Sequence, residues 1–216
     1  IKACIFDLDG VIVDTAKYHY LAWKELAGGL GFDFNEKDNE KLKGVSRMAS
    51  LDILLEIGNK KLDDETKLKY ADEKNKRYLE YIIKMTPEEI LPGVINFLND
   101  LRDINIKIGL GSASKNAMTI LQQLKLTKLF DTVIDGTKVA KAKPDPEVFI
   151  KGADALSVEP SECIVFEDAE AGIEAALNGG FYAIGIGSED VLGKAHYVMK
   201  GFVDVNFEDL IAKIIE

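Results

Sequence analysis

The chain has 216 residues, of which 47% are hydrophobic and 30% charged, and its formal net charge is −10. This length allows one sizeable core with a smaller inserted domain, and the composition is ordinary for a globular protein. Acidic and basic residues are mixed along the chain, so a basic nucleic-acid-binding face is not expected, and no apolar run approaches the roughly 20 residues that span a bilayer.

Short apolar runs that end in polar or glycine-containing turns predict strands buried on both faces, as in a parallel sheet. Between them, apolar residues recur at helical spacing over 94–104 and around 120–124, and a closing helix is predicted over 207–215. This alternation predicts an α/β fold with a doubly wound, Rossmann-like parallel sheet. The predicted strands are Ile1–Phe6, Ile106–Leu110, Thr132–Ile134, Cys163–Phe166 and Tyr182–Ile186.

The stretch from 15 to 90 has a different pattern, because it is helical, polar and rich in lysine, without convincing strands. We predict that residues 15–90 form an inserted helical cap domain, while residues 1–14 and 91–216 form the α/β core. An insert at this point follows the first strand and its loop. It is therefore expected over the carboxyl edge of the sheet, where ligands bind in this architecture.

The two cysteines, Cys4 and Cys163, each lie inside a short apolar run. This pattern favours buried free thiols in a reducing compartment over a disulfide or a metal site. The sequence enters a strand-like segment at once, which leaves no room for a signal peptide. We expect a cytoplasmic monomer whose partner is a small molecule rather than a nucleic acid or a membrane.

Four polar clusters follow predicted strands or lie near their ends, and their carboxylates are expected to converge. Two carboxylates about 5 Å apart repel by roughly 3 kcal/mol at an effective dielectric of ~20, so several of them need a cation. Oxygen ligands without a matching cysteine or histidine set indicate Mg²⁺. The cation of Lys143 and the hydroxyl of Ser112, in the other clusters, can bind a phosphoryl group. The residues concerned are Asp7, Asp9, Ser112, Lys143, Glu167 and Asp168.

Together these clusters resemble the haloacid dehalogenase (HAD) superfamily of phosphotransferases, and within it the β-phosphoglucomutase family. The likeness runs through all four core motifs, and the position of the insert resembles the helical cap of the superfamily. The segments that carry it are Asp7–Thr15, Ser112–Asn116, Lys43–Arg47 and the pair Lys74-Asn75, with His19 and Trp23.

The resemblance implies that Asp7 is the nucleophile and a Mg²⁺ ligand. It implies that Asp9 acts as general acid and base and offers its backbone carbonyl to the metal, and that Glu167 and Asp168 complete the metal site. Ser112 and Lys143 would hold the transferring phosphoryl group. The residues implied for the phosphate at the other end of the sugar are Arg47, Ser114, Lys115 and Asn116. The remaining substrate-binding residues implied are His19, Lys43, Gly44, Val45, Ser46 and Lys74.

The implied activity is that of an isomerase, a phosphomutase acting on a sugar phosphate. It would convert β-glucose 1-phosphate to glucose 6-phosphate through a phosphorylated aspartate, with glucose 1,6-bisphosphate as intermediate and activator. A phosphatase of the same superfamily, acting on a small sugar or polyol phosphate, is the main alternative. A phospho-acceptor signalling domain would leave the cap without a role. A dinucleotide loop at Gly109 and Gly111 is not supported, because Ser114 occupies the position of its third glycine.

Overall fold

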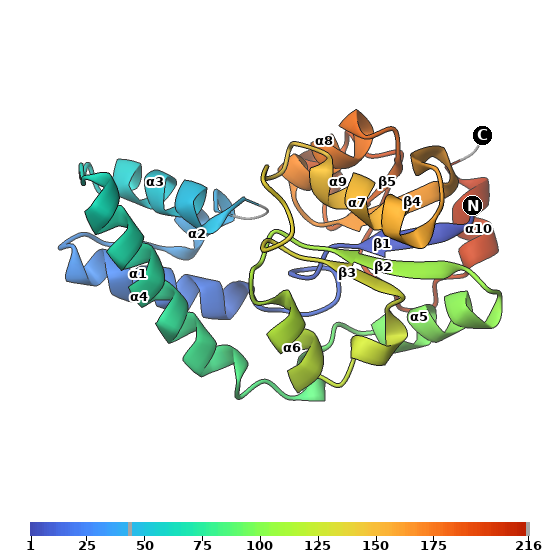
Figure 1. Ribbon diagram of the computed structural model, residues 1–216, viewed down its shortest axis with the longest axis horizontal. Helices are drawn as coiled ribbons and strands as arrows, with labels where there is room; N and C mark the ends of the chain where they lie inside the picture. Colours follow the sequence, from blue (N-terminus) through green and yellow to red (C-terminus); the bar gives the residue numbers. More distant parts are fainter. Residues whose placement is uncertain (43–44, 215–216) are drawn as a thin grey trace.

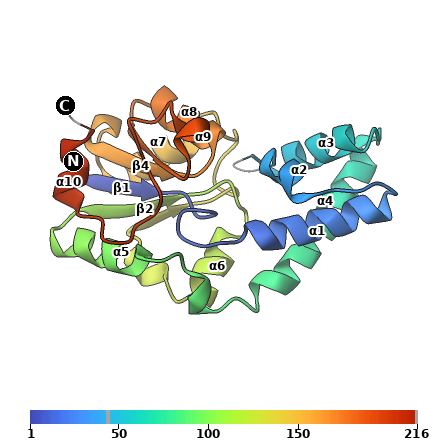
Figure 2. The same cartoon turned by 180° about the vertical axis from the view of Figure 1, so that it is seen from behind.

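The computed structural model describes residues 1–42 and 45–214. One parallel sheet carries helices on both faces, and a separate group of helices lies beyond one end of the sheet (Figures 1 and 2). In the described ranges the strand order is β3-β2-β1-β4-β5-β6, which confirms the doubly wound α/β prediction. The strands are β1 (Ala3–Phe6), β2 (Lys107–Gly111), β3 (Thr132–Ile134), β4 (Cys163–Glu167), β5 (Tyr182–Ile186) and β6 (Tyr197–Met199).

The core helices form two layers around this sheet. Apolar residues of α5, α6 and α10 pack on one face, and those of α7, α8 and α9 pack on the other. The α-helices are α5 (Val94–Asp103), α6 (Ala117–Gln123), α7 (Glu147–Leu156), α8 (Glu170–Asn178), α9 (Glu189–Leu192) and α10 (Phe207–Ala212). Short 3₁₀ turns are η1 (Pro87–Glu89), η2 (Thr127–Leu129) and η3 (Pro160–Glu162).

Strand β1 lies in the middle of the sheet and is buried along its whole length. Cys4 and Phe6 belong to the cluster under α5 and α6, whereas Ala3 and Ile5 belong to the cluster under α7 and α8. Because both faces are covered, the run is apolar without alternation. Phe6 stacks on Phe166 of β4 with ring centroids 4.7 Å apart. The residue after Phe6 is therefore held rigidly at the carboxyl edge.

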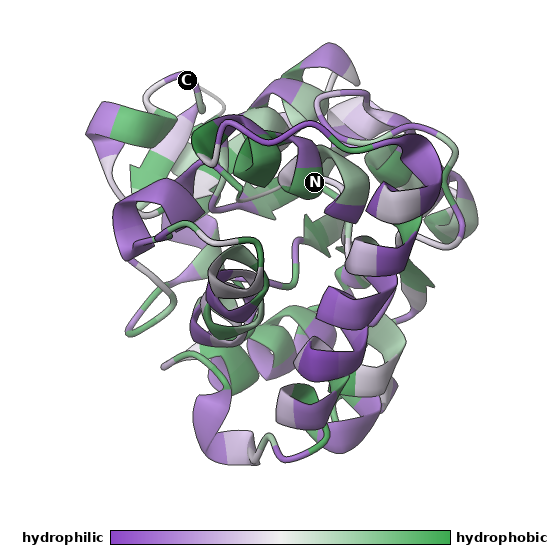
Figure 3. Cartoon of the chain, turned by 90° about the vertical axis from the view of Figure 1, so that its left-hand side faces the viewer, coloured by the Kyte–Doolittle hydropathy of each residue, from purple (hydrophilic) through white to green (hydrophobic). Residues whose placement is uncertain are grey.

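The helical group between β1 and α5 contains an apolar cluster of its own, separate from the two clusters that flank the sheet. Its helices pack around a cluster that includes Trp23, Phe34, Leu51 and Leu54. Figure 3 shows hydrophilic segments spread over the helices that face the viewer, with hydrophobic segments toward the interior. We call this group the cap. Its helices are α1 (Ala16–Gly29), α2 (Glu36–Glu40), α3 (Arg47–Ile57) and α4 (Asp64–Ile82).

Two neighbouring segments connect the cap to the core. Val13 forms an antiparallel bridge with Ile90, and the backbone N–H of Leu91 donates to the carbonyl of Ile12 at 3.0 Å. Gly93, with φ +83°, directly precedes α5, and a side chain there would collide with the backbone of Phe202. The exact limits 15–90 of the predicted cap domain stay a prediction.

The sequence missed one strand and several helix boundaries. β6 was not predicted because it is a short edge strand whose residues are all half-buried. The helix expected over 207–215 is described as Phe207–Ala212, and residues 215–216 lie outside the described ranges. Cys4 and Cys163 are both free and buried, as predicted. Among the described residues, no helix combines the length and the apolar character needed to cross a membrane.

Candidate active site

The loop after β1 brings Asp7 and Asp9 to the carboxyl edge of the sheet, where Asp168 follows β4. The backbone N–H of Asp7 donates to the carbonyl of Phe166 at 2.9 Å, and that of Asp9 donates to Oδ2 of Asp7 at 2.9 Å. Gly10 has φ +80°, and a Cβ there would lie 2.1 Å from Oδ2 of Asp168. Only glycine allows this close approach, so the turn places Asp168 directly against the Asp7 loop.

Lys143 is buried between two carboxylates below this loop. Its Nζ lies 2.5 Å from Oδ1 of Asp7 and 2.5 Å from Oε1 of Glu167, and it also donates to the carbonyl of Gly111 at 3.2 Å. Burial alone would lower the pKa of Lys143, but Asp7 and Glu167 raise it above its usual range. Lys143 therefore stays charged and can neutralise negative charge beside Asp7.

Glu167 lies at the end of β4 beside Lys143, and its role in a metal site stays a prediction. Its side chain is fully buried; Oε1 accepts a hydrogen bond from Lys143, and Oε2 accepts one from the backbone N–H of Ala169 at 2.8 Å. Both oxygens are thus held by protein donors, and Glu167 is not among the described residues that line the cavity. Its geometry is that of a counter-ion that holds Lys143 in place.

The carboxyl edge can accept Mg²⁺ through a small ligand set. Within residues 1–42 and 45–214, no group of three or more carboxylate, histidine or cysteine side chains is placed to hold a metal by itself. Asp7 and Asp168 nevertheless line the same cavity. Mg²⁺ is often held by one or two carboxylates, with waters and substrate phosphate completing the shell. This oxygen-only set therefore fits Mg²⁺ once a phosphate oxygen joins it.

Asp9 is placed to exchange a proton. Its carboxylate accepts a hydrogen bond from the Thr15 hydroxyl at the start of the cap. Burial and the neighbouring Asp7 raise the pKa of Asp9 to about 6, against the opposing influence of Thr15. A carboxyl group with such a pKa can both donate and accept a proton near neutral pH.

The turn after β2 links three of the predicted phosphate-binding residues. The backbone N–H of Ser114 donates to Oγ of Ser112 at 3.1 Å, and that of Asn116 donates to Oγ of Ser114 at 3.2 Å. Ser114 and Lys115 line the cavity. Ser112 is fully buried and does not appear among the described lining residues, and its hydroxyl supports this turn by accepting from Ser114.

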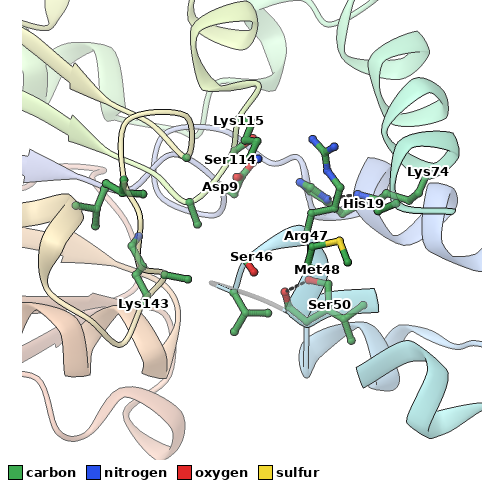
Figure 4. A pocket seen from close by; sticks show the side chains of 18 of the residues that line it. Asp9, His19, Ser46, Arg47, Met48, Ser50, Lys74, Ser114, Lys115 and Lys143 are labelled. Atoms are coloured by element: carbon green, nitrogen blue, oxygen red, sulfur yellow. Dashed lines mark hydrogen bonds between the residues drawn. The ribbon is translucent and has the colours of Figure 1, made fainter. Parts of the chain in front are cut away.

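On the cap side, Lys74 and His19 form a pair that faces the core residues (Figure 4). Nζ of Lys74 lies 2.8 Å from Nδ1 of His19 and over the ring of Trp23, 4.6 Å from its centroid. Burial and the nearby Arg47 lower the pKa of Lys74 to about 7. Burial and the two cations also lower the pKa of His19 well below its usual value, so a neutral ring accepts the hydrogen bond from Lys74.

Arg47 begins α3 and is half-buried at the mouth of the cap. Its Nη2 donates to Oδ1 of Asn75 at 2.8 Å, and its Nη1 lies 3.9 Å from the exposed carboxylate of Asp72. Burial lowers the pKa of Arg47, although it remains a cation at neutral pH. Val45 and Ser46 line the same cavity. The predicted residues Lys43 and Gly44 lie outside the described residues.

These groups surround one cavity of about 410 Å³ between cap and core. This volume is within the range of small-molecule sites. Several residues that line the cavity were not predicted from the sequence. Those after β3 follow the end of a predicted strand, so they could have been predicted from the rule that ligands bind at the carboxyl ends of the strands. The missed cap residues lie in no sequence pattern that marks a binding site. The missed residues include Asn39, Leu42, Met48, Ser50, Gly136 and Val139.

Comparisons with known proteins agree with this geometry. A family model described as haloacid dehalogenase-like hydrolase matches residues 1–180. A β-phosphoglucomutase of Bacillus subtilis is 44% identical over 96% of this chain and 92% of its own length. A phosphorylated carbohydrates phosphatase of Thermotoga maritima is 32% identical over 85% of this chain and 83% of its own. The crystal structure of a β-phosphoglucomutase from Clostridium difficile superposes with a TM-score of 0.95, at 46% identity, covering 100% of this chain and 97% of that one.

Proposed function

Because the chain belongs to the haloacid dehalogenase-like hydrolase family, we propose that it is a β-phosphoglucomutase that interconverts β-glucose 1-phosphate and glucose 6-phosphate. The observation that carries the proposal is the presence of cationic groups at both ends of one cavity. Lys143 lies beside Asp7 on the core side, and Arg47 lies on the cap side. A mutase that passes through a bisphosphate needs two phosphate sites, whereas hydrolysis of a monoester needs one.

In the first half-reaction, an oxygen of Asp7 attacks the phosphorus atom of glucose 1,6-bisphosphate. The Asp7 O–P bond forms and the P–O bond to the sugar breaks, while protonated Asp9 gives its proton to the departing sugar oxygen. Lys143 faces the carboxylate of Asp7 and stabilises the negative charge on the transferring group. In the second half-reaction Asp9 takes a proton from the attacking sugar hydroxyl. The sugar O–P bond forms as the O–P bond to Asp7 breaks, so the phosphoryl group passes from Asp7 to the sugar.

Asp7, Asp168 and the backbone carbonyl of Asp9 would hold Mg²⁺ in this proposal, and the bound ion would neutralise charge on the phosphoryl oxygens. Glu167 would act through Lys143, whose ammonium it contacts at 2.5 Å. Ser112 would support the turn that presents Ser114 and Lys115 to the cavity.

Residues of the cap and of the core turn after β2 would bind the second phosphate, and the cap would restrict access of water. Arg47, Lys115 and Asn116 would hold the phosphate that is not being transferred. Lys74 and His19 would contact the sugar between the two phosphate sites. Enclosure by the cap matters because water competes with the sugar hydroxyl for the phosphorylated aspartate.

The test is a product assay with β-glucose 1-phosphate, Mg²⁺ and a trace of glucose 1,6-bisphosphate, in which glucose 6-phosphate and free phosphate are followed together. We expect glucose 6-phosphate to form well ahead of free phosphate, no turnover by Asp7→Asn, and a clear loss by Arg47→Ala. Unchanged turnover by Arg47→Ala would refute the assignment of the second phosphate site.

A phosphatase acting on a sugar phosphate is the second candidate, and the identity to the Thermotoga maritima phosphatase favours it. It uses the same groups around Asp7, but water accepts the phosphoryl group. Free phosphate as the main product, with little glucose 6-phosphate, would establish this activity in place of the mutase.

A further inference from the structure

Asn75 joins the cap and the core through a single oxygen atom. It lies on α4 of the cap, and its Oδ1 accepts hydrogen bonds from Nη2 of Arg47 at 2.8 Å and from Nδ2 of Asn116 at 2.8 Å. Arg47 belongs to α3 of the cap, whereas Asn116 precedes α6 of the core. One carboxamide on α4 therefore holds donors from two other segments, one in the cap and one in the core.

The two donors that Asn75 holds are residues that the proposed function assigns to the second phosphate. A carboxamide oxygen has two acceptor positions, and here each takes one donor. Oδ1 of Asn75 thus brings the donor groups of Arg47 and Asn116 to one acceptor, the arrangement that a phosphate oxygen also requires. Arg47 and Asn116 are kept at a common point instead of turning separately into solvent.

The neutral charge of Asn75 matters for this role. Arg47 has the carboxylate of Asp72 at 3.9 Å, and that side chain is 76% exposed, so water screens the pair strongly. A carboxamide orients the guanidinium without neutralising it. A carboxylate at position 75 would orient it equally well but would compete with the phosphate for the same charge.

We propose that Asn75 is a positioning residue that assembles the second phosphate site across the boundary between cap and core. This inference rests on the proposed function, since it takes Arg47 and Asn116 as phosphate ligands. Without Asn75, the cap and core halves of the site lose their common acceptor. Binding of the sugar phosphate weakens, and water reaches the phosphorylated aspartate more often.

The test compares Asn75→Ala and Asn75→Asp with the wild-type chain. We expect Asn75→Ala to raise KM for β-glucose 1-phosphate about tenfold with kcat changed less than threefold, and to raise the share of free phosphate among the products. Asn75→Asp, which keeps shape and acceptors but adds charge, should raise KM further. The matched control is Asn96→Ala, the same change at an exposed position of helix α5.

A merely structural asparagine would give a different result. KM within twofold of wild type for Asn75→Ala, with an unchanged product ratio, would overturn the inference, as would wild-type KM in Asn75→Asp. If Asn75→Ala does not fold, as judged by cooperative urea unfolding, Asn75→Asp carries the test because it is isosteric. The double variant Asn75→Ala/Asn116→Ala should raise KM by less than the product of the two single effects, because both single changes break the same hydrogen bond.

A separate readout distinguishes failure of this inference from failure of the proposed function. Acetyl phosphate can phosphorylate Asp7 without occupying the second phosphate site, and mass spectrometry detects the added phosphoryl group. Wild type and Asn75→Ala should be labelled equally. A wild-type chain that neither accepts the phosphoryl group nor isomerises the sugar contradicts the proposed function, whereas an active wild type matched by Asn75→Ala contradicts the inference alone.

Discussion

At the scale of single residues, the site places charges where burial makes them costly. Lys143 is buried, but two carboxylates at 2.5 Å compensate its charge. Lys74 is also buried, yet its close polar partner is the neutral ring of His19 at 2.8 Å. The cation of Lys74 is thus compensated less fully than that of Lys143, and an anionic substrate would add negative charge beside it.

This imbalance predicts how stability depends on pH. The pKa of Lys74 is about 7 in the folded chain and near 10.4 when exposed, so between these values the unfolded chain binds the extra proton. Stability should therefore rise as pH increases from 7 to 10. Lys74→Met should remove this contribution and stabilise the chain at pH 7 by at least about 1 kcal/mol, because each pKa unit corresponds to about 1.4 kcal/mol.

Urea unfolding of wild type and Lys74→Met at pH 7 and pH 9.5 measures this effect. The stability difference between the two proteins should shrink as pH rises, with the same m-value for both. If the stability difference between wild type and Lys74→Met does not change with pH, Lys74 keeps its charge in the folded chain, and neighbouring groups offset the cost of burying that charge. The same variant should bind the sugar phosphate more weakly.

At the scale of secondary-structure elements, the carboxyl ends of β1, β2 and β4 could be predicted from sequence because apolar runs stop abruptly at Asp7, Ser112 and Glu167. The partners of these residues could not be predicted in the same way. The bonds of Glu167 to Lys143 and Ala169 depend on three-dimensional packing. The double role of Asn75 likewise follows from how α4 meets α3 and α6.

The contact of helix α8 with the end of β4 gives a testable element-scale prediction. A Cβ added at Gly172 would lie 2.0 Å from Oε1 of Glu167, whose side chain is fully buried and held by Lys143. Gly172→Ala should therefore displace Glu167, and with it Lys143. We expect destabilisation of about 1–3 kcal/mol in urea unfolding and slower phosphorylation of Asp7.

Gly180→Ala is not a suitable control, since φ there is +79°. Gly28→Ala serves better, because a Cβ at Gly28 in α1 meets nothing within 4 Å. Equal rates of Asp7 phosphorylation in Gly172→Ala and Gly28→Ala would show that the Glu167–Lys143 contact does not support the chemistry.

At the scale of the whole molecule, the cavity exists because two separately packed bodies face each other. The cap has its own apolar cluster, and paired segments near Val13 and Ile90 connect it to the core. Figure 4 shows Lys143 and Asp9 on the core side and His19, Lys74 and Arg47 on the cap side. The composition of each body could be predicted from sequence, but the distances across the cavity could not.

Ligand binding across the two bodies should be visible through Trp23, the chain's single tryptophan, which lines the cavity beside Lys74. In Asp7→Asn, which cannot turn over, we expect a saturable change in tryptophan fluorescence on titration with glucose 1,6-bisphosphate and Mg²⁺. In the double variant Asp7→Asn/Arg47→Ala, the midpoint of this titration should lie at a bisphosphate concentration at least tenfold higher. An identical midpoint would mean that the cap does not contact the second phosphate.

The most direct measurement of the central claim is the fate of solvent oxygen during turnover. The enzyme would convert β-glucose 1-phosphate in H₂¹⁸O, with Mg²⁺ and a trace of the bisphosphate, and mass spectrometry would follow the phosphate groups of all products. A mutase transfers the phosphoryl group from Asp7 to a sugar hydroxyl, so glucose 6-phosphate should accumulate without ¹⁸O in its phosphate. Predominant release of free phosphate carrying one ¹⁸O atom would contradict the account, because water would then be the acceptor.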